Sequence, residues 1–266
     1  MNILDKILFL KQKEIFINKE FYPIKKLEKF LFFERKCISL IKKIKKTKTG
    51  IIAEFKCKSP SKGIINKNVL VEKVVKDYES AGASGISILT ERYFFYGKNE
   101  DFIKSRSIVS TPLLRKDFIL DEYQIIESKS MGADVILLIA EILSKKQIKN
   151  FASLAESIDL EVIIEIHKEN EIDKITGNKN IIVGINNRNL RTFIVNPEHC
   201  LKLSSKISNH HIKIAESGIS DNIQKIVFLQ KQGFKGFLIG EHFMKTNDPG
   251  KSCKNMIEAL KVIQEQ

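Results

Sequence analysis

The sequence lacks tryptophan altogether and contains only four cysteines and five prolines among its 266 residues. The four cysteines are widely scattered, with no Cys-x-x-Cys pair and no nearby set of histidine ligands. This spacing argues against a metal site and favours free thiols in a reducing compartment. No apolar run reaches the roughly 18 residues of a transmembrane helix. Charged residues also interrupt the opening stretch MNILDKILFLKQKEIF, unlike a secretory signal. We therefore expect a cytoplasmic protein.

The formal net charge is +13, which has two interpretations. One is attraction to an anion, either a nucleic acid or a multiply charged small substrate. The other is a solvent-exposed surface that is rich in lysine. Basic residues are spread along the whole chain, and the densest run, 42–48, has no interleaved aromatic residues to stack on bases. We expect no nucleic-acid partner and no membrane partner.

Strand-like and helix-like segments alternate from residue 51 almost to the end of the chain. The expected strands are 51–57, 85–90, 112–116, 134–140, 161–166, 181–186, 212–216 and 236–240. The expected helices are 69–80, 102–107, 122–131, 145–158, 169–175, 197–206, 222–232 and 249–265. This alternation predicts an α/β fold, a single (βα)8 TIM barrel domain covering residues 1–266. A doubly wound open sheet is the structural alternative, but it seldom needs eight such regular units.

Residues 1–48 contain no expected strand and are predicted to form an N-terminal helical extension of the barrel. Apolar residues recur at helical spacing in two runs that Pro23 separates, and the second run covers 27–44. Residues 45–50 are the expected connector to the first strand.

Polar residues gather at the expected carboxyl ends of the strands, where barrels of this type form their active sites. They are Glu54, Lys56, Thr90, Glu91, Lys116, Glu165, Asn186 and Glu216. Within 51–57, Ile52, Glu54 and Lys56 share one face because side chains alternate along a strand. An ordinary salt bridge at a strand end would explain that pair alone. It does not explain the convergence of lysines, glutamates and an asparagine on one barrel mouth.

Three loops offer small residues for binding a phosphate group. Ser59-Pro-Ser-Lys-Gly63 follows the first strand, Glu216-Ser217-Gly218-Ile219 follows the seventh, and Ile239-Gly240-Glu241 follows the eighth. Small residues let the main chain approach an anion, and such barrels commonly hold phosphate in their last two loops.

Read in order, the chain contains the segments IIAEFKCKSPSKG, ISILTERYFFYG, TPLLRKDFILDEYQI, GADVILLIAEIL, VIIEIH, VGINNRNLRTF, IAESGI and GFLIGEHFMKTNDP. Together these segments resemble the indole-3-glycerol-phosphate synthase family. The resemblance implies a carbon–carbon carboxy-lyase of tryptophan biosynthesis. The reaction would close a ring in 1-(2-carboxyphenylamino)-1-deoxyribulose 5-phosphate, losing carbon dioxide and water to give indole-3-glycerol phosphate. The resemblance also implies that no metal and no organic cofactor takes part, and we expect a monomer.

Matching motif to motif assigns the family's site residues to positions in this chain. The catalytic positions would be Glu54, Lys56, Lys116, Glu165, Asn186 and Glu216. The substrate- and phosphate-binding positions would be Ser59, Phe95, Phe118, Leu137, Arg188, Ser217, Gly218, Gly240 and Glu241. Phe95, Phe118 and Leu137 would embrace the anthranilate ring. The reaction needs a proton donor for the ketone, an apolar wall beside the departing carboxylate, and an acid and a base for dehydration. Which lysine serves which step stays open.

The sequence departs from the family pattern in two respects. His242 stands where the family often has serine after the eighth strand, which puts a hydroxyl contact to phosphate there in doubt. Without tryptophan, any aromatic cap from the extension must come from Phe or Tyr.

Two other functions fit the sequence less well. Phosphoribosylanthranilate isomerase is another phosphate-binding barrel, but its chemistry centres on a Cys and Asp pair, and Cys57 should alternate outward. A non-enzymatic basic binding protein gives no reason for glutamates at the strand ends.

Overall fold

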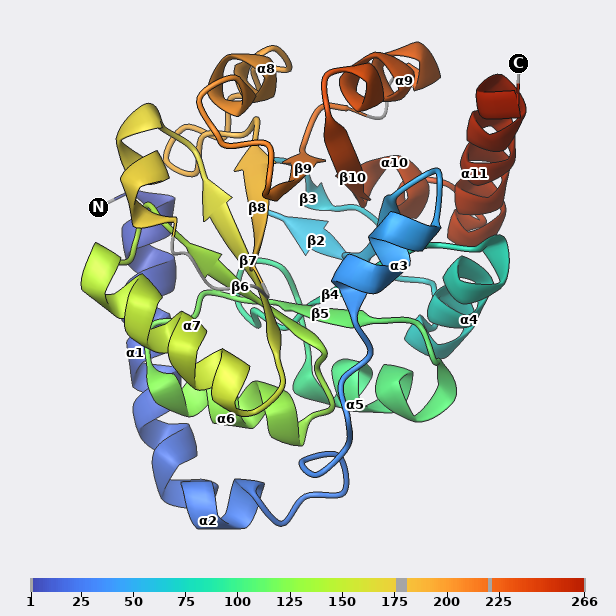
Figure 1. Ribbon diagram of the computed structural model, residues 1–266. Coiled ribbons are helices and arrows are strands. Elements are labelled where there is room, and N and C mark those ends of the chain that lie inside the picture. Colours follow the sequence, from blue (N-terminus) through green and yellow to red (C-terminus); the bar gives the residue numbers. More distant parts are fainter. Residues whose placement is uncertain (1, 176–180, 220–221, 266) are drawn as a thin grey trace.

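The protein is a closed barrel of eight parallel strands surrounded by helices, which confirms the predicted TIM barrel (Figure 1). The computed structural model describes residues 2–175, 181–219 and 222–265. The barrel strands, in chain order, are β1 (Ile51–Phe55), β4 (Gly85–Leu89), β5 (Leu113–Lys116), β6 (Val135–Ile139), β7 (Glu161–Ile166), β8 (Ile181–Asn186), β9 (Ile212–Glu216) and β10 (Phe234–Ile239). β1 pairs with both β4 and β10 and so closes the barrel.

Helices connect the strands on the outside of the barrel. They are α4 (Val71–Ala81), α5 (Asn99–Ile108), α6 (Glu122–Ser130), α7 (Lys145–Ser157), the 3-10 helix η1 (Glu169–Lys174), α8 (His199–Ser204), α9 (Ile223–Lys231), α10 (Glu241–Met244) and α11 (Pro249–Glu265). Their ends follow local chemistry. Asp121 and Gln124 form a capping box at the start of α6, and Ser144 and Gln147 form one at α7. Gly82 ends α4 with φ +88°, a conformation that glycine adopts without strain.

The strands bury both faces, and their side chains alternate between two apolar clusters. Along β1, Ile51, Ala53 and Phe55 point into the layer between strands and helices. Ile52 points into the barrel interior, and Glu54 follows on the same face. This alternation decides which strand-end residues can reach the mouth of the barrel.

The N-terminal extension contains α1 (Ile3–Phe21), α2 (Ile24–Leu27) and α3 (Leu40–Lys46). The prediction of a continuous helix over 27–44 is wrong. Helix α2 ends at Leu27, and turns and bends follow it. Further along, the Asp134 carboxylate accepts hydrogen bonds from the Arg35 side chain and from the backbone N–H of Ile38 (both 2.6 Å). The helix resumes where Ser39 caps α3. Since α3 ends at Lys46, the connector to β1 is 47–50, which is shorter than the expected 45–50.

The extension covers the barrel at more than one place. Leu40 and Ile44 of α3 join the interior cluster and lie against Gly85 and Gly236, near the amino ends of β4 and β10. Leu4 and Ile7 of α1 join the same cluster beside Phe118. A short hairpin, β2 (Lys58–Ser59) with β3 (Gly63–Ile64), follows β1 and was not predicted.

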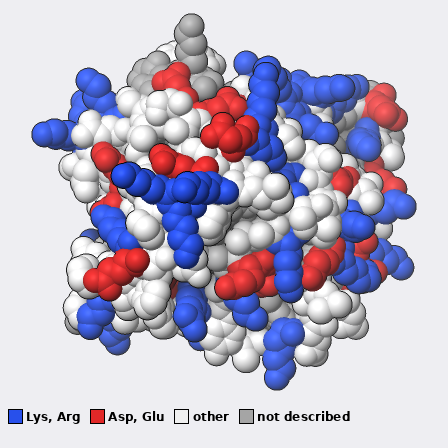
Figure 2. All heavy atoms as spheres, turned by 90° about the horizontal axis from the view of Figure 1, so that it is seen from below, with Lys and Arg blue, Asp and Glu red and all other residues white. Residues whose placement is uncertain are grey.

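Charged side chains of both signs are interspersed on the face shown in Figure 2, where Lys and Arg do not merge into one continuous patch. Within the described ranges, no helix is long and apolar enough to cross a membrane.

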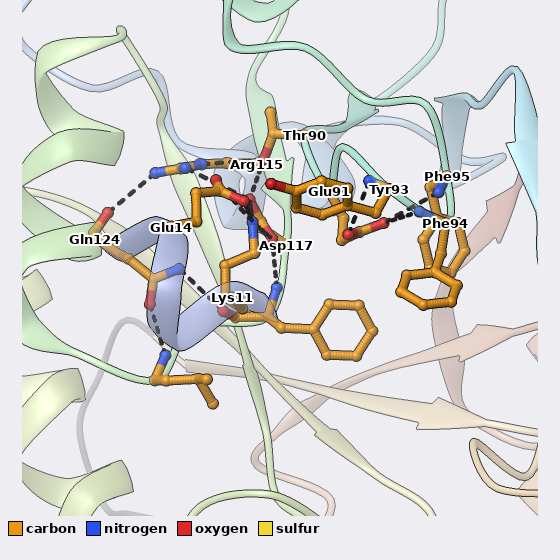
Figure 3. Close-up of polar contacts among 12 residues, drawn as sticks. Lys11, Glu14, Thr90, Glu91, Tyr93, Phe94, Phe95, Arg115, Asp117 and Gln124 are labelled. Carbon is orange, nitrogen blue, oxygen red and sulfur yellow. Dashed lines mark hydrogen bonds and ion pairs between the residues drawn. The ribbon is translucent and has the colours of Figure 1, made fainter. Parts of the chain in front are cut away.

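A buried ion pair attaches α1 to the barrel (Figure 3). The Lys11 ammonium lies 2.9 Å from Oδ1 of Asp117, the residue after β5, and both side chains are buried. Thr90 donates a 2.6 Å hydrogen bond to Oδ2 of Asp117, and Arg115 lies beside it. Burial alone would raise the pKa of Asp117, but Lys11 and Arg115 outweigh burial and lower it. Asp117 is therefore a carboxylate that depends on its cations.

We expect Lys11→Met to destabilise the protein by about 3–5 kcal/mol, because a buried carboxylate loses one of its cations. Lys6→Met is the matched control, since Lys6 is exposed on the same helix. Urea unfolding at pH 7 measures the free energy of unfolding of both variants. Equal stability of the two would show that the ion pair does not hold α1 in place.

Candidate active site

A pocket of about 590 Å³ opens at the carboxyl ends of the barrel strands. Every residue that the sequence assigned to the site lines it: Glu54, Lys56, Ser59, Phe95, Lys116, Phe118, Leu137, Glu165, Asn186, Arg188, Glu216, Ser217, Gly218, Gly240 and Glu241. The predicted residues therefore come together in one place.

Lys116 lies between two glutamates at the base of this pocket. It is the last residue of β5, and its Nζ lies 3.2 Å from Oε2 of Glu165 on β7. The same ammonium contacts Oε2 of Glu216 at the end of β9. Both carboxylates are buried, so the three groups form a compact charged cluster inside an apolar barrel.

Burial and neighbouring charges shift the pKa of each group in this cluster. Burial lowers the pKa of Lys116, but Glu216 and Glu165 outweigh it and raise that pKa well above its usual range. Burial raises the pKa of Glu165, but Lys116 and then His167 outweigh it and lower that pKa. Burial, reinforced by the neighbouring Glu165, raises the pKa of Glu216 to about 8, although Lys116 opposes this shift. At neutral pH the site thus holds an ammonium, a carboxylate and a carboxyl group that keeps its proton.

A second charged pair lies at the end of β1, where Nζ of Lys56, the residue after the strand, is 2.5 Å from Oε1 of Glu54. Two glycines make room for the buried carboxylates. A β-carbon on Gly240 would lie 2.3 Å from Oε1 of Glu54, and one on Gly184 would lie 2.6 Å from Oε1 of Glu216. Gly240 therefore supports Glu54 as well as bordering the pocket, and Gly184 is a supporting residue that the sequence reading missed.

The rim of the pocket is tied together by Arg188, which follows β8. Its Nη1 donates to Oγ of Ser61 at 3.1 Å and to the carbonyl of Phe193 at 3.2 Å. Its Nη2 lies 3.8 Å from Oε2 of Glu241. Oδ1 of Asn186 accepts from the backbone N–H of Arg188 at 2.9 Å and orients this turn. Arg188 thus joins the loops after β1, β8 and β10.

The turn after β9 is arranged to present backbone N–H groups. Ser217 and Gly218 both have positive φ, +65° and +63°. Their carbonyls accept hydrogen bonds from Asn187 (3.0 Å) and Lys225 (2.9 Å). Because a peptide N–H points opposite to the carbonyl of its own peptide unit, the N–H groups of the next residues face away from those partners. Two successive N–H groups in such a turn form a common anion-binding concavity.

An apolar wall lies on the opposite side of the pocket. The rings of Phe95 and Phe118 are 6.3 Å apart, and Leu137 is buried beside them. Glu91 holds the loop that carries Phe95, because its carboxylate accepts from the backbone N–H groups of Tyr93, Phe94 and Phe95 at 2.7–3.0 Å (Figure 3). The loop that carries Phe95 is therefore held in place by the buried Glu91 side chain.

Thr90 and Glu91 are strand-end residues that do not line the pocket. Thr90 binds Asp117, and Glu91 caps the loop that follows it. Cys57 packs against the outer apolar cluster, as its outward alternation predicted.

Several residues that line the pocket were not predicted from the sequence: Leu89, Asp117, Ile139, Leu190, Phe193, Val195, Leu238 and Lys245. The loop residues among them had no signal in the strand-end pattern. Phe193 has a φ of +59°. It belongs to the segment VGINNRNLRTF but lies beyond the end of β8. His242 also borders the pocket. Within the described part of the chain, no group of three or more His, Cys, Asp or Glu side chains is arranged to hold a metal ion.

We expect Lys116→Met to destabilise the fold in a pH-dependent way. Without the ammonium, the pKa values of both Glu165 and Glu216 should lie above their unfolded values, so the folded state binds extra protons and loses stability as pH rises. The loss should be small at pH 5 and reach about 3 kcal/mol at pH 8. Urea unfolding at both pH values measures it, with Lys245→Met as the control on the exposed rim. A pH-independent loss would contradict this account of the cluster.

Comparison with known proteins places this chain in a family. The family model described as indole-3-glycerol phosphate synthase matches residues 4–256. The indole-3-glycerol phosphate synthase of Bacteroides thetaiotaomicron is 40% identical over 259 residues, covering 97% of this chain and 99% of the relative. The one from Campylobacter fetus is 42% identical over 257 residues, covering 96% and 98%.

Two solved structures share the fold at low sequence identity. Thiamine phosphate pyrophosphorylase from Pyrococcus furiosus aligns with a TM-score of 0.56 and 16% identity, covering 80% of this chain and 97% of that one. A structure titled "Native KDPGal structure" aligns with the same TM-score of 0.56 and 13% identity, covering 83% and 97%. At such identities the likeness supports the barrel alone. The family model and the two curated relatives span nearly the whole chain, and they show that the chain belongs to the indole-3-glycerol phosphate synthase family.

Proposed function

We propose that this pocket closes the indole ring of 1-(2-carboxyphenylamino)-1-deoxyribulose 5-phosphate, releasing carbon dioxide and water, as a carbon–carbon carboxy-lyase of tryptophan biosynthesis. The observation that carries the proposal is the Lys116 ammonium, held between Glu165 and Glu216. This ammonium faces a pocket with an apolar wall on one side and anion-binding loops on the other.

The order of the strands in the barrel determines which part of the substrate each loop would contact. Phe95, Phe118 and Leu137 follow or lie on β4, β5 and β6, which are neighbours in the barrel. Ser59, Ser217, Gly218, Gly240 and Glu241 belong to the loops after β1, β9 and β10, which are also neighbours. The aromatic ring would rest on the first group, and the phosphate would sit in the second, with Arg188 between their loops. The ketone then lies in the middle, between Lys116 and Lys56.

Lys116 is placed to act in the ring-closing step. Its raised pKa keeps it protonated, so it can donate a hydrogen bond or a proton to the ketone oxygen as the ring carbon attacks the carbonyl carbon. The attacked oxygen becomes a hydroxyl group. The carboxylate on the attacking ring carbon then leaves as carbon dioxide, and its bonding electrons restore the aromatic ring. The apolar wall favours this loss because it cannot solvate the carboxylate.

The Lys56–Glu54 pair would act in the dehydration step, because β1 is the neighbour of β10, whose loop belongs to the proposed phosphate site. Lys56 would give a proton to the departing hydroxyl, forming water, and Glu54 would accept the proton that the new ring loses. Glu165 and Glu216 hold Lys116, and Asn186 orients the rim turn beside Arg188.

We also propose that residues 1–266 form one barrel domain, with 1–48 as its helical extension, acting as a cytoplasmic monomer. Four free cysteines and interspersed surface charges are consistent with such a protein. We propose no nucleic-acid partner, no metal and no organic cofactor, because acid–base groups alone account for each bond change above.

A direct assay tests this function. Purified wild-type protein with the carboxyphenylamino substrate should give indole fluorescence and one equivalent of carbon dioxide. Lys116→Met should lose about 10²–10⁴-fold in kcat, the range for removal of a general acid. Exhaustive chelation should leave the wild-type rate unchanged. A wild-type protein with no product, or a Lys116→Met variant retaining more than about a tenth of kcat, would overturn the proposal.

The raised pKa of Glu216 predicts the alkaline limb of the pH profile. kcat/KM reports ionisations of the free enzyme, so it should fall as pH rises through about 8 and Glu216 loses its proton. Glu216→Gln carries a permanently neutral group of the same shape. This variant should be slower overall but should lack the fall near pH 8, as measured by initial rates from pH 6 to 9.5. An unchanged alkaline limb in Glu216→Gln would assign the ionisation to another group.

A further inference from the structure

His167 is a buried histidine directly behind the catalytic cluster. It follows β7, two residues after Glu165, and its side chain is 4% exposed. It does not line the pocket, yet its Nε2 lies 3.2 Å from Oε1 of Glu165. The reaction steps proposed above give this histidine no task.

The contact divides the two oxygens of Glu165 between two nitrogen groups. Oε1 faces His167, while Oε2 lies 3.2 Å from the Lys116 ammonium. A carboxylate held at both oxygens cannot rotate about its terminal bond without breaking one of these contacts. The position of Glu165, and through it that of Lys116, therefore depends on a group outside the pocket.

The histidine is itself held in place by its main chain. Its backbone N–H donates to Oε2 of Glu171 on η1 at 2.6 Å, and its carbonyl contacts Nε2 of His199 on α8 at 2.7 Å. Neither ring nitrogen has a partner in hydrogen-bond geometry among the described residues, so the approach of Nε2 to Glu165 is an ion-pair contact. The ring is thus fixed by the backbone and by packing, and Glu165 is the group that its side chain contacts.

The charges around this ring are mainly acidic. Glu165 comes from β7, Glu171 from η1, and Glu141 from the loop after β6, where Lys168 and Arg191 bind Glu141 at 3.1 and 2.9 Å. Burial lowers the pKa of His167, but Glu165, Glu171 and Glu141 outweigh burial and raise it. The protonated ring is therefore favoured beside Glu165, where a cation strengthens the contact.

We propose that His167 is a positioning residue, which holds the Glu165 carboxylate so that its other oxygen anchors the Lys116 ammonium in the pocket. The inference rests on the proposed role of Lys116 in ring closure. His167 itself touches no substrate and exchanges no proton with it.

The first test compares two substitutions of His167. His167→Leu removes the donor but keeps an apolar side chain in the buried space, whereas the amide of His167→Gln can still donate to Glu165. We expect His167→Leu to lower kcat by about 10- to 100-fold, because Glu165 and the Lys116 ammonium would shift from their positions, with little change in KM. His167→Gln should recover a large part of this loss. His210→Gln, on an exposed turn, is the control.

A double-mutant cycle distinguishes positioning from general packing. If His167 acts through Glu165, the His167→Leu change should have little further effect on single-turnover rates in a Glu165→Gln background. A purely structural role would give the same fold-loss in both backgrounds. Equal losses, or a His167→Leu variant with wild-type kcat, would overturn the inference while leaving the proposed function intact.

A titration gives a readout that does not depend on activity. Nitrogen NMR of the His167 ring, assigned by its absence in His167→Gln, should show a pKa that falls in Glu165→Gln, because the neighbouring anion is removed. An unchanged ring pKa would contradict the contact itself. A wild-type protein that forms no indole product would instead contradict the proposed function, whatever the ring titration shows.

Discussion

The rest of the site depends on one constraint, the burial of an ammonium group between two carboxyl groups inside an apolar barrel. Removing these charges from water costs several kcal/mol per ion, which their mutual attraction offsets only when the geometry is good. Lys116, Glu165 and Glu216 come from three strands whose register the closed barrel fixes. The barrel therefore supplies, through backbone hydrogen bonds far from the pocket, the geometry that makes this cluster tolerable.

The strand that carries Lys116 connects this constraint to the rest of the molecule. Three successive residues after the strand core have different partners: Lys116 faces the carboxyl pair, Asp117 binds Lys11 and Thr90, and Phe118 joins the apolar wall. Alternation along the strand separates the first two, since successive side chains point to opposite sides. Helix α1 thus acts on the pocket through Asp117. One attachment of the extension is therefore to Asp117, the residue next to Lys116.

The sequence predicted the barrel and the residues of its mouth for a physical reason. Side-chain alternation and the parallel arrangement of strands determine which residues reach that mouth, as Glu54, Lys56 and Glu165 show. The same reasoning could not predict Glu91, whose carboxylate turns back to its own loop. It also could not pair Lys11 with Asp117, because the two are 106 residues apart and nothing local links them. Nor could it predict that Asp134, a distant residue, binds the backbone N–H of Ile38 within the helix expected over 27–44. Local sequence patterns thus predicted which way side chains point along a strand. Contacts between residues far apart in the sequence could be identified only from the three-dimensional structure.

The charge balance of the pocket explains why Glu216 should keep its proton. Among the strand-end groups alone, Glu54, Glu165 and Glu216 would outnumber Lys56 and Lys116 if all were ionised. This excess negative charge would lie beside the middle of a substrate that carries both a carboxylate and a phosphate. The raised pKa of Glu216 removes one of these negative charges at neutral pH. The neighbouring carboxylates also raise the pKa of His167 behind Glu165, which favours a positive charge there. The same burial that makes the cluster costly to form therefore adjusts its charge to an anionic substrate, because a low-dielectric site favours the protonation state with the smallest net charge.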